Sequence, residues 1–107
     1  MELNAQERDA LSRVTQILRE RFGATEIILY GSAARDELDA ESDIDLLAVF
    51  PRVDWEMRKE IIDAIFDIEL ECGRIFSINC YSEEEMEHSP LRSSPLVLTA
   101  RREGRPV

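Results

Sequence analysis

The chain contains few of the residues that cross-link a fold or interrupt its helices and strands. Its 107 residues include only 4 Gly, 4 Pro, 2 Cys and 1 His. The cysteines, Cys72 and Cys80, have neither the number nor the spacing of a disulfide framework or a metal-binding pair, and Cys80 lies in an apolar run typical of a core. A metal site built on histidines is also excluded, because His88 is the only one. At this length, a single domain can bury a sufficient core without disulfides or bound metal.

We expect neither a signal peptide nor an apolar run long enough to span a membrane. We therefore expect a cytoplasmic protein that does not bind membranes. Acidic residues outnumber basic ones by 23 to 13, which gives a net charge of −10. Because nucleic-acid-binding domains usually present basic patches, this charge argues against a long DNA or RNA substrate. A small anionic ligand that arrives with a metal ion stays compatible, since the metal offsets the local charge.

Helices and strands are expected to alternate within one domain, residues 1–107. Capping signals predict helices that begin near Asn4, Asp54, Ser82 and Ser94. Apolar, β-branched runs predict strands at 25–30, 43–50 and 75–81. This order of elements predicts the fold class as α/β (α+β), a small sandwich of helices and a sheet. Trp55, at the start of the second long helix, is expected to pack against the rest of the fold, with stacking on a base as an alternative.

The end of this second long helix is ambiguous. From Phe66 to Cys72, apolar and acidic residues alternate, which is typical of a strand. Helical spacing fits the same apolar residues nearly as well. Both assignments therefore remain open from the sequence.

The segment from Gly31 to Asp45 carries the most chemistry. The first predicted strand ends at Gly31 and Ser32, and Asp43 and Asp45 open the next strand. Side chains alternate along a strand, so Asp43 and Asp45 point to one face, roughly 7 Å apart at Cα. Two such carboxylates can hold Mg²⁺, which binds one or two protein carboxylates together with substrate phosphates. Gly31 lets the backbone approach a phosphate, to which the Ser32 hydroxyl can donate a hydrogen bond.

In two segments the chain resembles the minimal nucleotidyltransferase domain of the DNA polymerase β superfamily; these read Tyr30-Gly31-Ser32-Ala33-Ala34-Arg35 and Ser42-Asp43-Ile44-Asp45-Leu46-Leu47. The resemblance implies a polymerase β-like fold, a small mixed β-sheet flanked by helices. It also implies Mg²⁺ or Mn²⁺ at Asp43 and Asp45, and a nucleoside triphosphate, expected to be ATP, at Gly31, Ser32 and Arg35. Arg35 has an alternative role in a surface ion pair with a neighbouring carboxylate. The implied reaction transfers a nucleoside monophosphate, AMP from ATP, to a hydroxyl of a protein or small molecule.

The third predicted strand departs from this family pattern. Nucleotide-transferring members generally carry a third carboxylate there, which helps to bind the metal and can take the proton of the attacking hydroxyl. The aligned residue in this chain is Ser77, and neither Ser77 nor Asn79, next on the same face, is a general base at pH 7.

Three alternatives follow from this departure. Transfer can proceed without a protein base, since phosphoryl transfer depends mainly on positioning and electrostatic stabilisation. A carboxylate among Asp67, Glu69 and Glu71 can substitute, if that segment is a strand beside the site. Or the domain can bind metal and nucleotide without turnover.

The resemblance also implies partners. Single-domain members often act as the antitoxin of a small helical HEPN-domain protein, and some attach AMP to that toxin. A net charge of −10 suits a basic partner, so a catalytically degenerate module that acts by complex formation is an alternative. A third functional alternative is an enzyme that modifies small molecules, such as an aminoglycoside transferase, although such enzymes usually need a further domain for the acceptor. Exposed strand edges in a small sheet also make a homodimer an expectation.

Overall fold

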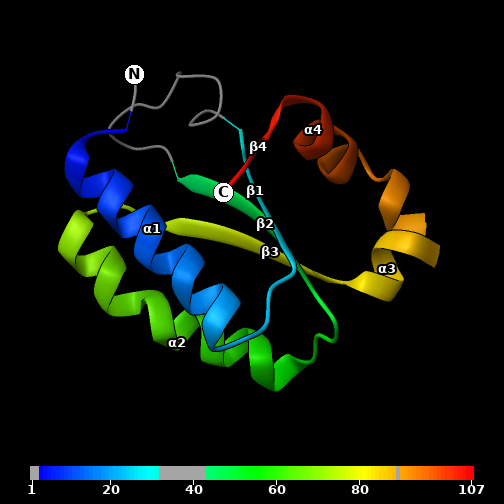
Figure 1. The fold of residues 1–107 in the computed structure, drawn as a ribbon, viewed down its shortest axis with the longest axis horizontal. Helices are drawn as coiled ribbons and strands as arrows, with labels where there is room; N and C mark the ends of the chain where they lie inside the picture. Colours follow the sequence, from blue (N-terminus) through cyan, green and yellow to red (C-terminus); the bar gives the residue numbers. More distant parts are fainter. Residues whose placement is uncertain (1–2, 32–42, 89) are drawn as a thin grey trace.

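The computed structural model describes residues 3–31, 43–88 and 90–107 (Figure 1). Within these residues the helices are α1 (Ala5–Glu20), α2 (Trp55–Cys72), α3 (Glu83–His88) and α4 (Pro95–Glu103), with a 3₁₀ helix η1 (Pro90–Ser93). The strands are β1 (Glu26–Tyr30), β2 (Ile44–Phe50), β3 (Phe76–Ser82) and β4 (Arg105–Pro106). Among the described helices, none combines the length and the apolar character that crossing a membrane requires.

The four strands form one mixed sheet in the order β3-β2-β1-β4. β2 and β3 run parallel, whereas β1 is antiparallel to both β2 and β4. Helices α1 and α2 lie together on one side of the sheet, and α3 and α4 lie away from them (Figure 1). The predicted small mixed sheet flanked by helices is thereby confirmed.

The core is divided by the alternation of side chains along β2. Leu46, Ala48 and Phe50 join the larger core beneath α1 and α2. Leu47 and Val49 instead pack against Val97 and Ala100 of α4 in a second cluster. Both faces of β2 are therefore covered, which explains the continuous apolar run in its sequence.

The helix starts follow from local capping. The Asn4 side chain accepts a hydrogen bond from the Glu7 backbone N–H (2.7 Å), and the Glu7 carboxylate accepts one from the Asn4 N–H (2.9 Å). Asp54 accepts from the Met57 N–H (2.8 Å) at the start of α2. The same type of contact is made by Ser82 before α3 and by Ser94 before α4. Each cap satisfies backbone donors that the helix itself leaves unpaired, so these predicted starts are confirmed.

α2 continues as a helix to Cys72 and ends at Gly73, which has a left-handed backbone (φ +72°). The strand alternative for this segment is wrong. The proposed substitute carboxylates therefore lie on a helix beneath the sheet, where Glu69 accepts from the Phe76 N–H (2.8 Å) and Glu71 pairs with Arg13 (2.6 Å). The expectation that Trp55 packs into the fold is also wrong, because its side chain is exposed.

A buried ion pair ties α1 to the turn between α2 and β3. The Arg74 guanidinium donates to the Glu7 carboxylate, and both side chains are almost fully buried. Burial alone would raise the pKa of Glu7, but hydrogen bonds from Asn4 and Arg74 and the charge of Arg74 outweigh it. The pKa of Glu7 is therefore held below its usual value.

Candidate functional site

The predicted metal-binding aspartates lie where β1 ends and β2 begins. Asp43 directly precedes β2 and is exposed, whereas Asp45 is the second residue of β2 and is half-buried. Asp45 stands opposite Tyr30 of β1 on one side and opposite Ser77 of β3 on the other. Residues that stand directly opposite each other in a sheet share a face. Tyr30, Asp45 and Ser77 therefore form a row across three strands, and Ser77 occupies the position beside Asp45.

Gly31 lies so close to the Asp45 side chain that only glycine fits at this position. Its backbone is left-handed (φ +73°), a conformation that L side chains rarely adopt. A Cβ at this position would also collide with Oδ2 of Asp45 and lie 3.3 Å from its Cγ. The absence of a side chain at Gly31 thus gives the Asp45 carboxylate its place beside the turn.

Tyr30 and Asn79 add a polar contact to the same face. The Asn79 amide donates a hydrogen bond to the Tyr30 hydroxyl (2.7 Å). Burial raises the pKa of Tyr30 to about 12, and the charges of Asp45 and Tyr81 act in the same direction. Tyr30 is therefore a neutral phenol at pH 7 and not a base. Tyr30 was not predicted as a site residue, and its position directly before Gly31 was the available signal. Its place on the face of Asp45 and Asn79 depends on how β1, β2 and β3 pair.

Ser32 and Arg35, the other predicted nucleotide-binding residues, lie outside the described residues. Within the described part of the chain, no group of three or more His, Cys, Asp and Glu side chains is placed to hold a metal ion. Among the described residues, the carboxylates near the turn are those of Asp43 and Asp45. This donor set fits Mg²⁺, which keeps several water ligands and is commonly bound by one or two carboxylates and substrate phosphates.

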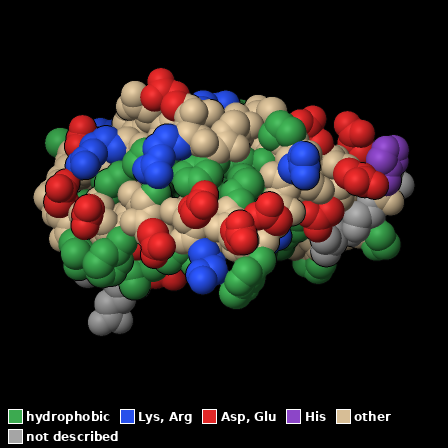
Figure 2. Space-filling view, turned by 90° about the horizontal axis from the view of Figure 1, so that it is seen from below, with side chains coloured by type: hydrophobic (Ala, Val, Ile, Leu, Met, Phe, Trp, Pro, Cys, Tyr) green, Lys and Arg blue, Asp and Glu red, His purple; other side chains and the backbone are tan. Residues whose placement is uncertain are grey.

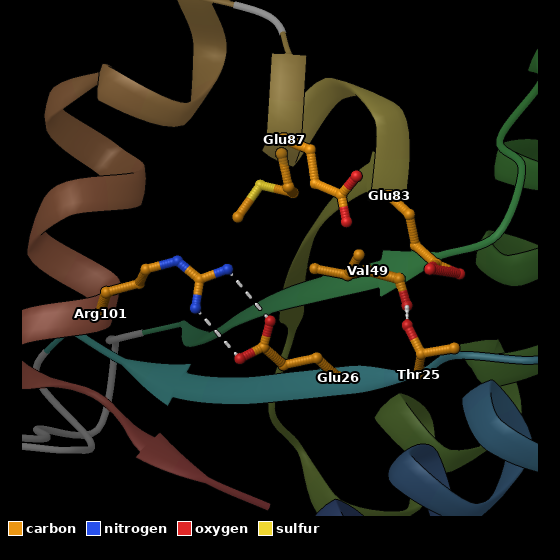
Figure 3. Close-up of a pocket in the computed structure, with 7 residues that line it drawn as sticks. Thr25, Glu26, Val49, Glu83, Glu87 and Arg101 are labelled. Carbon is orange, nitrogen blue, oxygen red and sulfur yellow. Dashed lines mark hydrogen bonds and ion pairs between the residues drawn. The ribbon is translucent and has the colours of Figure 1, made fainter.

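A separate cavity of about 440 Å³ lies at the far end of β2 (Figure 3). Val49 lines it, four residues beyond Asp45 and so roughly 13 Å away along the strand. Arg101 forms a two-point ion pair with Glu26 there (3.1 Å for both contacts), and the Thr25 hydroxyl donates to the Val49 carbonyl (3.3 Å). This cavity is thus not continuous with the row at Asp45, and much of its polar lining is already engaged.

Comparison with known proteins places these features in a family. The chain matches the family model described as nucleotidyltransferase domain over residues 11–92. It is 37% identical over 86 residues to a CCA-adding enzyme of Methanopyrus kandleri, an alignment that covers 78% of this chain and 16% of the enzyme. The chain thus spans a small part of that relative's length.

Two crystal structures of mutant toxin–antitoxin MntA–HpeT complexes share the fold. Their TM-scores are 0.59 and 0.60, at 17% and 19% sequence identity. The matches cover 89% and 91% of this chain, and 69% and 70% of the matched chains. Fold and family model agree with the resemblance seen in the sequence, and the chain belongs to the nucleotidyltransferase domain family.

Proposed function

We propose that this domain is a Mg²⁺- or Mn²⁺-dependent nucleotidyltransferase that transfers AMP from ATP to a hydroxyl of a protein or small-molecule acceptor. The observation that carries the proposal is the contact of the Asp45 carboxylate with Gly31 at the start of β2. A phosphate held at this turn would lie next to a carboxylate that can bind its metal. The family match over residues 11–92 supports the same chemistry.

Asp43 and Asp45 would hold the metal, and Gly31, Ser32 and Arg35 the triphosphate. When bound, the metal supplies positive charge that offsets the triphosphate and the departing pyrophosphate. The acceptor oxygen attacks the α-phosphorus in line, its new bond to phosphorus forms, and the bond to the pyrophosphate oxygen breaks. In this proposal the hydroxyl proton passes to solvent, and neither Ser77 nor the neutral Tyr30 serves as its base.

The domain is also proposed to act as the antitoxin of a HEPN-type helical partner. The fold shared with the MntA–HpeT complexes and the net charge of −10 support this role. An alternative is a catalytically degenerate module that works by complex formation alone. The observation that favours this alternative is Ser77, which stands opposite Asp45 where a third carboxylate would serve as metal ligand and base.

Calorimetric titration of Mg²⁺·ATP into the purified chain tests the site without knowledge of the acceptor. Binding is expected for the wild-type chain and is expected to be lost in an Asp43→Ala, Asp45→Ala double variant. A matched control is Asp63→Ala, Asp67→Ala, which removes the same charge from exposed positions of α2. Absence of wild-type binding at millimolar nucleotide, or equal loss in both variants, would refute the assignment. Binding without pyrophosphate release in the presence of a partner would favour the degenerate module.

A further inference from the structure

α2 carries a second apolar face that the fold leaves uncovered. Trp55, Ile62, Phe66 and Leu70 are 72%, 62%, 54% and 67% exposed. Their spacing of seven, four and four residues places them along one side of the helix. The buried residues Ile61, Ile65 and Ile68 lie on a different side, against the core. We call the four exposed residues the α2 stripe.

The α2 stripe continues into a groove between α2 and β3. This groove has a volume of about 230 Å³, and Trp55 and Ile62 line it together with Phe76, Ile78 and Cys80 of β3. Figure 2 views the molecule from below relative to Figure 1, the side on which α2 lies, and shows hydrophobic side chains set among both acidic and basic ones. Exposed apolar surface of this kind, bordered by charge, is typical of protein interaction sites.

The edge of the sheet beside this groove is partly engaged by side chains of α2. β3 is the edge strand on this side of the sheet. The Cys80 carbonyl accepts a hydrogen bond from Arg58 (3.0 Å), and the Phe76 N–H donates to Glu69 (2.8 Å). Both side chains come from α2 and occupy backbone groups that strand pairing would need. A helix, which needs only apolar contacts and a charged border, therefore suits this surface better than an added strand.

The charge next to the α2 stripe decides the type of helix. On the side away from β3, the stripe is bordered by the acidic residues Glu56, Asp63 and Asp67 and by one lysine, Lys59, so that negative charge prevails there. A second copy of this chain would bring the same net charge of −10 to the contact. A basic border would instead be attracted by these carboxylates, which favours a different protein over a homodimer.

We propose that the α2 stripe docks an amphipathic helix of another protein, whose apolar side is bordered by Lys and Arg. The inference rests on the partner role in the proposed function and names the surface for it. It does not depend on nucleotide transfer, since α2 and the row at Asp45 lie on opposite sides of the sheet.

Trp55 provides a direct assay, because it is the only tryptophan of the chain and belongs to the α2 stripe. The probe is a synthetic amphipathic helix of 18 residues, the length of α2, with a leucine side bordered by Lys and Arg and without aromatic residues. Titration of this peptide is expected to shift the Trp55 emission to shorter wavelength. A peptide with the same leucines and a Glu border is expected to leave it unchanged.

Two matched variants localise the contact. Phe66→Ser and Leu98→Ser each remove an apolar side chain that is 54% exposed, the first from the stripe and the second from α4. Phe66→Ser is expected to weaken peptide binding about tenfold or more, and Leu98→Ser to leave it unchanged. Equal affinity of both variants, equal binding of the two peptides, or no wild-type shift would overturn the proposal. So would a concentration-dependent dimer that Phe66→Ser dissociates. Mg²⁺·ATP titration of the same variants reports the nucleotide site separately.

Discussion

Replacement of Gly31 by alanine is expected to disable the nucleotide site at a modest cost in stability. Gly31 and Gly73 have nearly the same left-handed backbone, with φ of +73° and +72°. At Gly31 an added Cβ would collide with the Asp45 carboxylate, whereas nothing lies within 4 Å of the Cβ position at Gly73. Comparing Gly31→Ala with Gly73→Ala therefore separates backbone strain, which both share, from displacement of Asp45, which only the first causes.

The magnitudes follow from these two contributions. Left-handed backbone costs alanine about 1–2 kcal/mol, and reduced freedom of the unfolded chain offsets about 0.4–1 kcal/mol of this. A net loss of about 1 kcal/mol lowers Tm by roughly 4–8 °C in a domain of this size. Gly31→Ala should lose somewhat more than Gly73→Ala, because the Asp45 side chain must also move. Mispositioning of a metal ligand typically weakens metal binding about 10–100-fold, so a similar loss of Mg²⁺·ATP affinity is expected for Gly31→Ala alone.

Thermal unfolding followed by circular dichroism measures the shared strain, and calorimetric titration of Mg²⁺·ATP measures the effect on the site. The expected pattern is a lower Tm in both variants and weakened nucleotide binding only in Gly31→Ala. Wild-type affinity in Gly31→Ala, or an equal loss of affinity in Gly73→Ala, would show that the contact of Gly31 with Asp45 does not position the site.

Two further predictions concern the titratable groups of Tyr30 and Glu7. With the other tyrosine replaced by phenylalanine, absorbance at high pH should report ionisation of Tyr30 near pH 12. Asp45→Asn should lower the pKa of Tyr30 by removing a negative charge, whereas Asn79→Ala should raise it by removing a donor to the phenolate. Shifts of the same sign in both variants would show that these two side chains do not act on Tyr30 as described. Folding lowers the pKa of Glu7 from its usual value of 4.5. The Glu7–Arg74 pair should therefore stabilise the fold at pH values above 4.5, and this stabilisation should be lost as the pH falls through the lower pKa of the folded state. Glu7→Gln should lower the free energy of unfolding, measured with urea, by roughly 3 kcal/mol at pH 7. It should also reduce the loss of stability at acid pH; an unchanged loss would exclude this pair as its source.

The ambiguity at 66–72 has a specific physical origin. Phe66 and Leu70 belong to the exposed stripe of α2, whereas Ile68 faces the core and Cys72 packs against it. Two apolar faces on one helix therefore interleave in the sequence and imitate the alternation of a strand. Trp55 was misplaced for the same reason, since a helix with two apolar faces does not reveal which one the fold covers.

The site could be predicted in part. The spacing of Asp43 and Asp45 on one strand, and Ser77 as the residue aligned with a third carboxylate, came from pattern and resemblance. The contact between Gly31 and Asp45 and the hydrogen bond from Asn79 to Tyr30 could not, because each joins separate strands. β4 was missed because two polar or turn-forming residues, Arg105 and Pro106, carry no strand signal of their own. Their pairing with β1 depends on where α4 ends.

Local chemistry was sufficient wherever the interacting groups are neighbours in the chain. Helix caps such as Asn4 with Glu7 satisfy backbone donors within the first turn. The continuous apolar run of β2 indicates that both faces of this strand are buried. Side-chain contacts between distant segments required the folded chain, because strand register and helix placement set them. The row of Tyr30, Asp45 and Ser77, the ion pair of Glu7 with Arg74 and the uncovered face of α2 all belong to this second group.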